Sequence, residues 1–274
     1  RPIPVHHYLG RKHHGELAYN PVSAPLLDYS ITVTERSTRE DLAALYRLVH
    51  LMRIDHRIFN HHSARIPGND DHILINPFGL LQDEITADTL IKVDRDGQAI
   101  DGAGADANRA GAIIHWAVYD ARDDVRCIVH HHSAAAVAVS ALDGGLLPLS
   151  QGAMQFYNRI GYHDYEGMVF SDAEKPRLAA SLGPYRLMLL RHHGALVCGR
   201  SIAECYVLTD DLEKACRSQL LAMQSGGPLV LPSPDLCEHT AAQFEALPQP
   251  RGERLDWPAA LRRLDRLGID YKGG

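Results

Sequence analysis

The sequence lacks the patterns that mark secreted and membrane proteins. No run reaches the roughly 18 consecutive apolar residues of a membrane-spanning helix, and the amino terminus shows no signal-peptide pattern. Cysteine is scarce and forms no C-x-x-C pair; the five cysteines are Cys127, Cys198, Cys205, Cys216 and Cys237. An odd number lying mostly in apolar segments indicates reduced thiols, so we expect a cytoplasmic protein.

Nucleotide-binding and acyl-transfer motifs are missing as well. The chain contains no G-x-G-x-x-G, no Walker loop, no G-x-S-x-G, no nucleophilic Cys/His signature and no internal repeat. The net charge of −6 and the sequence pI of about 6.3 give no support for a nucleic-acid or acidic-membrane partner. With 45% hydrophobic residues among 274, the chain can build a sizeable core.

Three parts of the chain differ in character. Residues 1–36 mix Pro, His, Tyr and Gly without a period, and we expect an extended arm. Residues 37–225 carry interleaved helix and strand patterns and form the predicted domain. Residues 226–274 are a Pro-rich tail that ends in a short amphipathic helix. We expect this tail to pack on the body or on a neighbouring subunit.

Capping boxes and hydrophobic periodicity predict the main elements. Ser37, Ser171 and Ser201 each precede a glutamate by three residues, which indicates three helix starts. Helices are expected over 37–52, 108–122, 134–142, 171–182, 201–224 and 257–267. Strands are expected over 72–77, 126–132, 186–191 and 195–199, with a hairpin over 91–100 and a polar loop over 59–68. Tight turns between strands favour an α/β fold with a mixed or mainly antiparallel sheet and helices on both faces.

Two histidine-rich segments predict a metal site. If residues 126–132 form a strand, His130 and His132 point to one face and His131 to the other. A second apolar run delivers His192 and His193 to a glycine turn. A divalent ion is the usual shared partner of neighbouring imidazoles, so we expect His130, His132 and either His192 or His193 to bind one. The alternative is that paired histidines simply lie at solvated strand ends.

Other polar residues are candidates for binding or activating a substrate. Arg65 or Arg109 could clamp a carboxylate bidentately, although each could equally be a surface charge. Asn60 and His62 could line a site or only form a turn. A lone histidine on a helix, His115, is more typical of a hydrogen-bonded core position than of a ligand. The candidates for proton transfer are Glu166, Tyr165 and His163, with Gln151 as a polar orienter.

Together these segments resemble the class II aldolase/adducin superfamily, which includes L-fuculose-phosphate aldolase and related epimerases, dehydratases and decarboxylases. The resemblance covers roughly residues 40–225. It rests on Asn60-His-His-Ser63, Asn76-Pro-Phe-Gly79, His115-Trp-Ala-Val-Tyr-Asp-Ala-Arg122 with Asp124-Val125, His130-His-His132, and Arg191-His-His-Gly194 followed by Gly199.

The resemblance implies a fold and a ligand set. It implies an α/β/α layered domain with a central, mainly antiparallel sheet, and a metal held by His130, His132 and His193. Family members are commonly tetramers with sites at subunit interfaces, which implies the same here. The substrate-binding candidates under this resemblance are Asn60, His62, Arg65, Asn76, Arg109 and His115.

The chain also departs from the aldolases of this family. Their catalytic glutamate, four residues before the helix histidine, is replaced by Gly111. The segment that supplies a tyrosine from a neighbouring subunit reads Ser150-Gln-Gly-Ala153. The phosphate-cradling positions read Asn60-His61 and Arg109-Ala110. A sugar-phosphate aldolase reaction is therefore not expected.

Three functions remain in competition. The first is a lyase using Zn, Fe(II) or Mn to cleave a C–C bond, by aldol cleavage or decarboxylation, in a small carboxylate or carbonyl substrate. The second is a non-haem Fe(II) oxygenase, since the family resembles the iron enzymes of aminocoumarin pathways, which oxidatively decarboxylate an aromatic keto or hydroxy acid. The third is a non-enzymatic, adducin-like interaction module.

Overall fold

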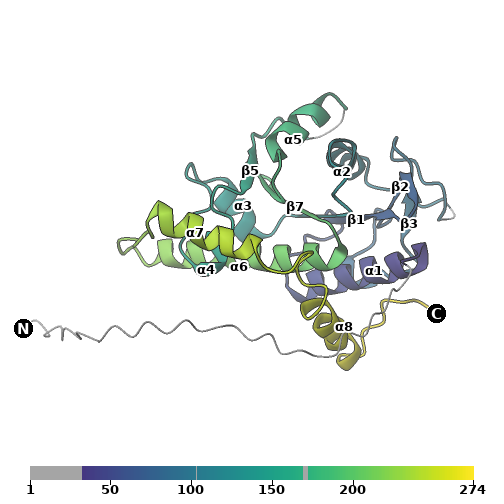
Figure 1. Cartoon of the computed structure of the whole chain (residues 1–274). Coiled ribbons are helices and arrows are strands. Elements are labelled where there is room, and N and C mark those ends of the chain that lie inside the picture. The colour runs from purple at the N-terminus through teal and green to yellow at the C-terminus, as the bar shows by residue number, and fades with distance from the viewer. Residues whose placement is uncertain (1–32, 103, 169–171) are drawn as a thin grey trace, which may run out of the picture. The chain divides into compact units, whose positions relative to one another are not determined.

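The computed structural model describes residues 33–102, 104–168 and 172–274. The expected arm over residues 1–36 lies almost entirely outside the described residues. Figure 1 shows a central sheet with helices above and below it. In the described part of the chain, no helix combines the length and the apolar character needed to cross a bilayer.

The sheet has seven strands and is mixed but mainly antiparallel, as the sequence predicts. Their order is β3-β2-β1-β4-β7-β6-β5, and the pairing of β5 with β6 is parallel whereas the others are antiparallel. The strands are β1 (His61–Ile66), β2 (Asn69–Ile75), β3 (Ile91–Val93), β4 (Cys127–His131), β5 (Ile160–His163), β6 (Leu187–Leu190) and β7 (Gly194–Gly199).

Helices cover both faces of this sheet and complete the predicted three layers. The helices α2 and α5 lie on one face, and α1, α3 and α6 lie on the other (Figure 1). The α-helices are α1 (Glu35–Leu51), α2 (Arg109–Ala121), α3 (Ala134–Ser140), α4 (Gln151–Met154), α5 (Lys175–Leu182), α6 (Ile202–Gln224), α7 (Pro234–Glu245) and α8 (Asp256–Arg266), with 3₁₀ turns at Gln82–Glu84 and Asp172–Glu174.

Strand alternation divides the buried residues into two cores. On β4, Ile128 packs into the core beneath α2 and α5, whereas Cys127 and Val129 pack into the core against α1 and α6. The same alternation sends His130 and His131 to opposite faces. The central strands are therefore buried on both faces, and all five cysteines are buried and unpaired.

Several elements differ from the sequence-based expectation, and β5 and α4 form where no strand or helix was predicted. Residues 61–66, interpreted as a polar loop, form the buried strand β1. Its polar side chains are tolerated in the sheet because Ser63 and Arg65 find hydrogen-bond partners on α2 or just after it. The tail also contains α7, which the sequence analysis did not predict; α7 packs against α4, and α8 packs against α1 and α6.

Helix starts agree only in part with the predicted capping boxes. Ser201 caps α6 as expected, through a bond from the backbone N–H of Glu204. Helix α1 begins one turn earlier than predicted, because Thr34 is its N-cap and Ser37, the third residue of the helix, closes the capping box. Ser171 lies outside the described residues, and Glu174, the N-cap of α5, makes no capping bond with its side chain.

Candidate metal centre

Three histidines, two from the end of β4 and one from the turn between β6 and β7, come together at one end of β4. His130 is in β4, His132 follows it directly, and His193 lies in the turn between β6 and β7. One ring nitrogen from each histidine lies within 4.8 Å of those from the other two. His192 is exposed with φ of 59° and is not part of the cluster. The structure thus favours His193 over His192 as the third candidate ligand.

Gly194 is what allows the turn to approach β4 so closely. A Cβ atom at this position would lie 2.3 Å from the His131 carbonyl oxygen, far inside van der Waals contact. Only glycine therefore lets β7 begin at that point and carry His193 toward His130. The glycine of the HH-G pattern has a steric role in placing the third histidine.

Hydrogen bonds fix the rings of the other two histidines. The Nδ1 atom of His130 lies 3.0 Å from the Ala195 carbonyl oxygen, which can only accept, so Nδ1 carries the proton and Nε2 keeps its lone pair. The Nδ1 atom of His132 lies 3.3 Å from Nδ1 of His56. Such outer hydrogen bonds are the usual way in which metal-binding imidazoles are oriented.

Burial keeps these imidazoles neutral at physiological pH. Burial is the main cause that lowers the pKa of His130 well below its ordinary value, with a further effect from His132. It also lowers the pKa of His132 to about 3, and that of His193. A neutral imidazole offers a lone pair, whereas a protonated one repels a cation.

The donor set fits a divalent ion. The Nε2 atoms of His130 and His132 are 2.9 Å apart, and two lone pairs at that distance repel unless a proton or a cation lies between them. Two nitrogens bound at about 2.0–2.1 Å to one tetrahedral ion lie roughly 3.3 Å apart, so little movement is needed. Imidazole is a ligand for Zn²⁺ and Fe²⁺ alike, so the geometry does not choose between them.

A buried chain of polar side chains starts beside this cluster. The His61 ring lies 4.8 Å from that of His130, its partner across the β1–β4 pair. Nδ1 of His61 is 3.0 Å from Nε2 of His115, whose Nδ1 bonds to Ser63. The Ser63 hydroxyl is 2.9 Å from that of Tyr119. His61 is not among the residues predicted from the sequence, since residues 59–68 have the polar character of a loop. Period-2 alternation along β1 places His61 and Ser63 on the same face.

A second group of candidates adjoins His193. A small pocket is lined by His163, Tyr165, Glu166, Glu174, Arg191 and His193. His163 bonds to Ser181 at 3.0 Å and to Glu174 at 3.2 Å. The Tyr165 ring centroid is 6.3 Å from that of His193, and its side chain is half exposed. Glu174 was also not selected from the sequence, where it appeared only as part of a capping box.

Glu166 lines this pocket, but its carboxylate is paired with the guanidinium of Arg177. Both of its carboxylate oxygens bond to Arg177, one at 2.7 Å to Nε. This guanidinium lowers the pKa of Glu166. A carboxylate in such a pair is a weak proton acceptor, so the structure does not favour Glu166 for proton transfer.

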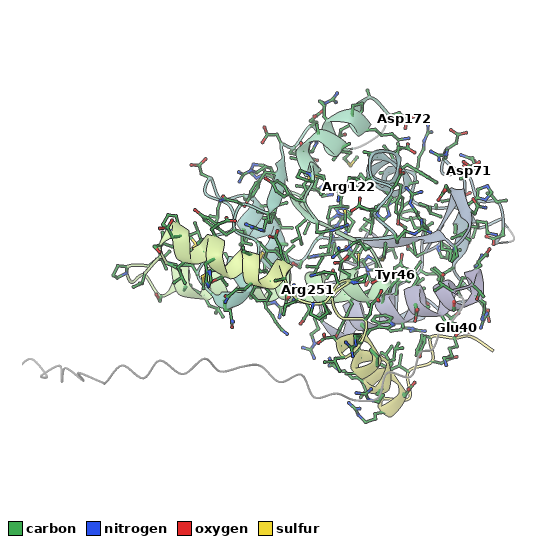
Figure 2. The ribbon with its side chains drawn as sticks, in the orientation of Figure 1. Glu40, Tyr46, Asp71, Arg122, Asp172 and Arg251 are labelled. Atoms are coloured by element: carbon green, nitrogen blue, oxygen red, sulfur yellow. The ribbon has the colours of Figure 1, made fainter. Side chains whose placement is uncertain are left out.

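Three substrate-binding candidates lie away from the cluster. Tyr46 lies on α1 beneath the sheet (Figure 2). Its hydroxyl donates to Asn76 at 2.7 Å, and the His62 ring lies 4.4 Å from the Tyr46 ring. Asn60 donates to the carbonyl of Ile54 at 3.1 Å. All three are buried, and Asn76 and His62 lie on the α1 side of the sheet, opposite to His130.

The two arginine candidates have different surroundings. Arg65 is buried, donates to the carbonyls of Val125 and Tyr119, and stacks on the Tyr119 ring at 4.7 Å. These contacts connect β1 to α2 and to the loop after it, so the Arg65 guanidinium stabilises the fold. Arg109, the first residue of α2, is exposed and has no ion-pair partner within the described ranges. Gln151 begins α4, is exposed, and belongs to a helix that packs on α6 and α7.

Comparison with known proteins agrees with this fold. The family model for the class II aldolase and adducin N-terminal domain matches residues 40–220. A putative aldolase class 2 protein of Caulobacter vibrioides is 43% identical over 88% of this chain and 94% of its own length. The crystal structure of an aldolase II superfamily protein from Pseudomonas syringae has a TM-score of 0.83 and 42% identity, over 89% of this chain and 98% of that one. The chain belongs to the class II aldolase and adducin family.

Two further relatives show how widely this fold is used. An L-fuculose 1-phosphate aldolase from Glaciozyma antarctica is 27% identical with a TM-score of 0.77, over 87% of this chain and 93% of that one. Alpha-adducin of Rattus norvegicus is 37% identical over 88% of this chain, but the match spans only 34% of that protein. The predicted resemblance is confirmed, and the fold with it.

Proposed function

We propose that this protein is a divalent-metal-dependent lyase that cleaves a C–C bond in a small carboxylate or carbonyl substrate. The observation that carries this proposal is the convergence of His130, His132 and His193, with a carbonyl and His56 bonded to the outer nitrogens of two rings. A divalent ion bound there would polarise a carbonyl oxygen and stabilise the negative charge left when an adjacent C–C bond breaks. Zn, Mn and Fe(II) all fit the three nitrogens.

Arg109 is the residue we propose for the substrate carboxylate. It lies in the first turn of α2, two residues before Gly111, which packs against His61 beside the cluster. The amino end of a helix also favours a negative charge. A planar guanidinium that is free of an acidic partner can take a carboxylate bidentately. Arg65, which is occupied by two backbone carbonyls, is not part of the proposed site.

For proton transfer we propose Tyr165 and the His163–Glu174 pair. All three line the pocket next to His193, and the two members of the pair are 3.2 Å apart. Glu166 is held by Arg177, so it is a less suitable proton carrier. The family's glutamate is absent at Gly111 and leaves no carboxylate at that position. These differences support a substrate other than a sugar phosphate.

The decisive experiment measures bound metal and oxygen dependence. Protein purified anaerobically is analysed for metal and then assayed with a panel of 2-hydroxy and 2-oxo acids. Turnover without O₂ on Zn or Mn supports the lyase. Bound iron with substrate-dependent O₂ uptake supports instead the Fe(II) oxygenase. A protein that retains no ion after incubation with Zn, Mn and Fe(II) overturns the proposal and leaves an adducin-like interaction module.

We further propose that the chain forms a homo-oligomer with its sites near subunit interfaces. Tyr165, which lines the pocket, and Met168, which follows the lining residue Gly167 in sequence, expose 52% and 71% of their surface, which suits a contact with a second copy. Light scattering after size-exclusion chromatography tests this, and a monomer at micromolar concentration contradicts it. A cytoplasmic location stays a prediction of the sequence.

A further inference from the structure

His61 lies beside the three-histidine cluster without being part of it. The side chain is 4% exposed, and its ring packs between those of His130 and His115, at 4.8 and 4.9 Å. On its third side is Gly111, where a Cβ atom would lie 2.7 Å from the ring. The ring is therefore held in place by a strand, a helix and a second histidine.

The buried chain behind His61 decides which of its nitrogens carries the proton. Ser63 lies between Tyr119 and His115, and His115 lies between Ser63 and His61. The Tyr119 hydroxyl has no bonding partner other than Ser63 within the described ranges, and Tyr119 is 1% exposed. A buried hydroxyl hydrogen is nearly always bonded, so Tyr119 must donate to Ser63.

Each later step then follows from the one before it. Ser63 accepts from Tyr119 and donates its own hydrogen to Nδ1 of His115. With Nδ1 accepting, the neutral His115 ring carries its proton on Nε2 and donates it to Nδ1 of His61. With its Nδ1 accepting in turn, a neutral His61 carries its proton on Nε2. The opposite direction would leave the Tyr119 hydrogen without an acceptor.

The free end of this chain is thus a fixed N–H donor. Nε2 of His61 has no hydrogen-bond partner within the described ranges, yet it is not fully enclosed as the ring nitrogens of His62 are. The His61 ring lies 4.8 Å from that of His130, so this nitrogen belongs to a ring that borders the cluster. We propose that the Nε2–H of His61 donates a hydrogen bond to an anionic oxygen of the substrate bound at the three-histidine cluster. This inference rests on the proposed function, because it takes the cluster to be the substrate site.

A hydrogen-bond donor at this position favours one class of substrate. A donor fixed at this place stabilises an oxygen that becomes more negative, such as the oxygen of an enolate formed from a 2-oxo or 2-hydroxy acid. The donor needs no reorganisation, because packing and the bond from His115 hold the ring before substrate arrives. We therefore expect planar dianions that resemble such an enolate to bind through His61.

The test uses oxalate, a planar dianion, and protein loaded with Zn²⁺. Titration calorimetry compares the wild type with His61→Phe, which keeps an aromatic ring but removes the donor, and with His61→Gln, which offers an amide N–H. We expect His61→Phe to bind oxalate about 10- to 100-fold more weakly, the effect of a lost hydrogen bond to a charged group. His61→Gln should recover part of this loss. His62→Phe, the next residue on β1 and facing α1, is the matched control and should bind like the wild type.

Two readouts keep the inference distinct from the proposed function. Metal content should be the same in all four proteins, because His61 is not a proposed ligand. Equal oxalate affinity in wild type and His61→Phe overturns the inference while the lyase proposal stands. No oxalate binding by the Zn²⁺-loaded wild type overturns both. In the metal-free protein, nitrogen NMR should show the Nε2–H form of His61, and the Nδ1–H form would overturn the inference alone.

Discussion

Gly111 and His61 occupy space that only one side chain can fill. A Cβ atom on Gly111 would lie between 2.7 and 2.8 Å from three atoms of the His61 ring. Gly111 is also buried in α2, where a glycine costs up to about 1 kcal/mol relative to alanine. The resemblance to the aldolases implies a catalytic glutamate at this position, and in this chain a histidine from strand β1 fills the space beside it.

The first prediction tests this relationship with a double-mutant cycle. Gly111→Ala alone should destabilise the fold by about 1–3 kcal/mol, because the methyl group meets the ring. In a His61→Ala background the same change should be neutral or stabilising. Urea denaturation of the four proteins gives the coupling free energy, which we expect at about 0.5–3 kcal/mol. Additive effects would show that the two side chains do not compete for space.

The second prediction separates the two histidines of the β6–β7 turn. His193→Ala should lose the bound ion during dialysis, whereas His192→Ala should keep about one ion per chain, since His192 is exposed and outside the cluster. The measurement is metal content by elemental analysis, with circular dichroism to confirm that both variants fold. Retention of the ion by His193→Ala would contradict the proposed ligand set.

The third prediction concerns acid stability and the neighbouring His62. Burial lowers the pKa of His62 to about 3, and both ring nitrogens are enclosed without a hydrogen bond. In the unfolded chain the same group titrates near pH 6.5. As the pH falls below 6.5, His62 therefore binds a proton in the unfolded state but not in the folded state. The free energy of unfolding then decreases by about 1.4 kcal/mol per pH unit until the pH approaches 3.

His62→Phe should remove this part of the acid sensitivity. The phenyl ring can keep the contact with Tyr46 and leaves no buried nitrogen unpaired. The free energy of unfolding of the variant minus that of the wild type should be about 2 kcal/mol larger at pH 5 than at pH 8. Urea denaturation of metal-free protein at both pH values measures the difference. A stability difference that does not change with pH would show that His62 titrates normally in the folded state.

The family and the clustering of three histidines could be predicted from the sequence because both depend on local patterns. Period-2 alternation places His130 and His132 on one face of a strand whatever the rest of the chain does. The family resemblance then favoured His193 over His192, and the structure brings that residue into the cluster. Capping by Ser201 was likewise decided within four residues of the chain.

What could not be predicted depends on partners distant in sequence. The segment 61–66 is polar enough to be interpreted as a loop, and it becomes a central strand only because residues some 50 to 60 positions away accept and donate its hydrogen bonds. The need for glycine at position 111 depends in the same way on a distant residue, because the His61 ring leaves no room for a Cβ atom there. Arg65 and Arg109 look alike in the sequence. Only the fold shows that Arg65 bonds to two backbone carbonyls, whereas Arg109 has no ion-pair partner in the described part of the chain.

The last prediction uses these two arginines. Arg65→Met should destabilise the protein by about 2–4 kcal/mol, because it removes two charged hydrogen bonds to the carbonyls of Val125 and Tyr119 and the stacking on the Tyr119 ring. Arg109→Met, at an exposed position, should change stability by no more than about 0.5 kcal/mol. Oxalate affinity should respond in the reverse order, with a loss in Arg109→Met and little change in the folded Arg65→Met protein. Urea denaturation and calorimetry on the same samples measure both quantities. If Arg65→Met lowers oxalate affinity while Arg109→Met leaves it unchanged, Arg65 would be the carboxylate-binding residue, and the proposed orientation of the substrate toward the amino end of α2 would have to be abandoned.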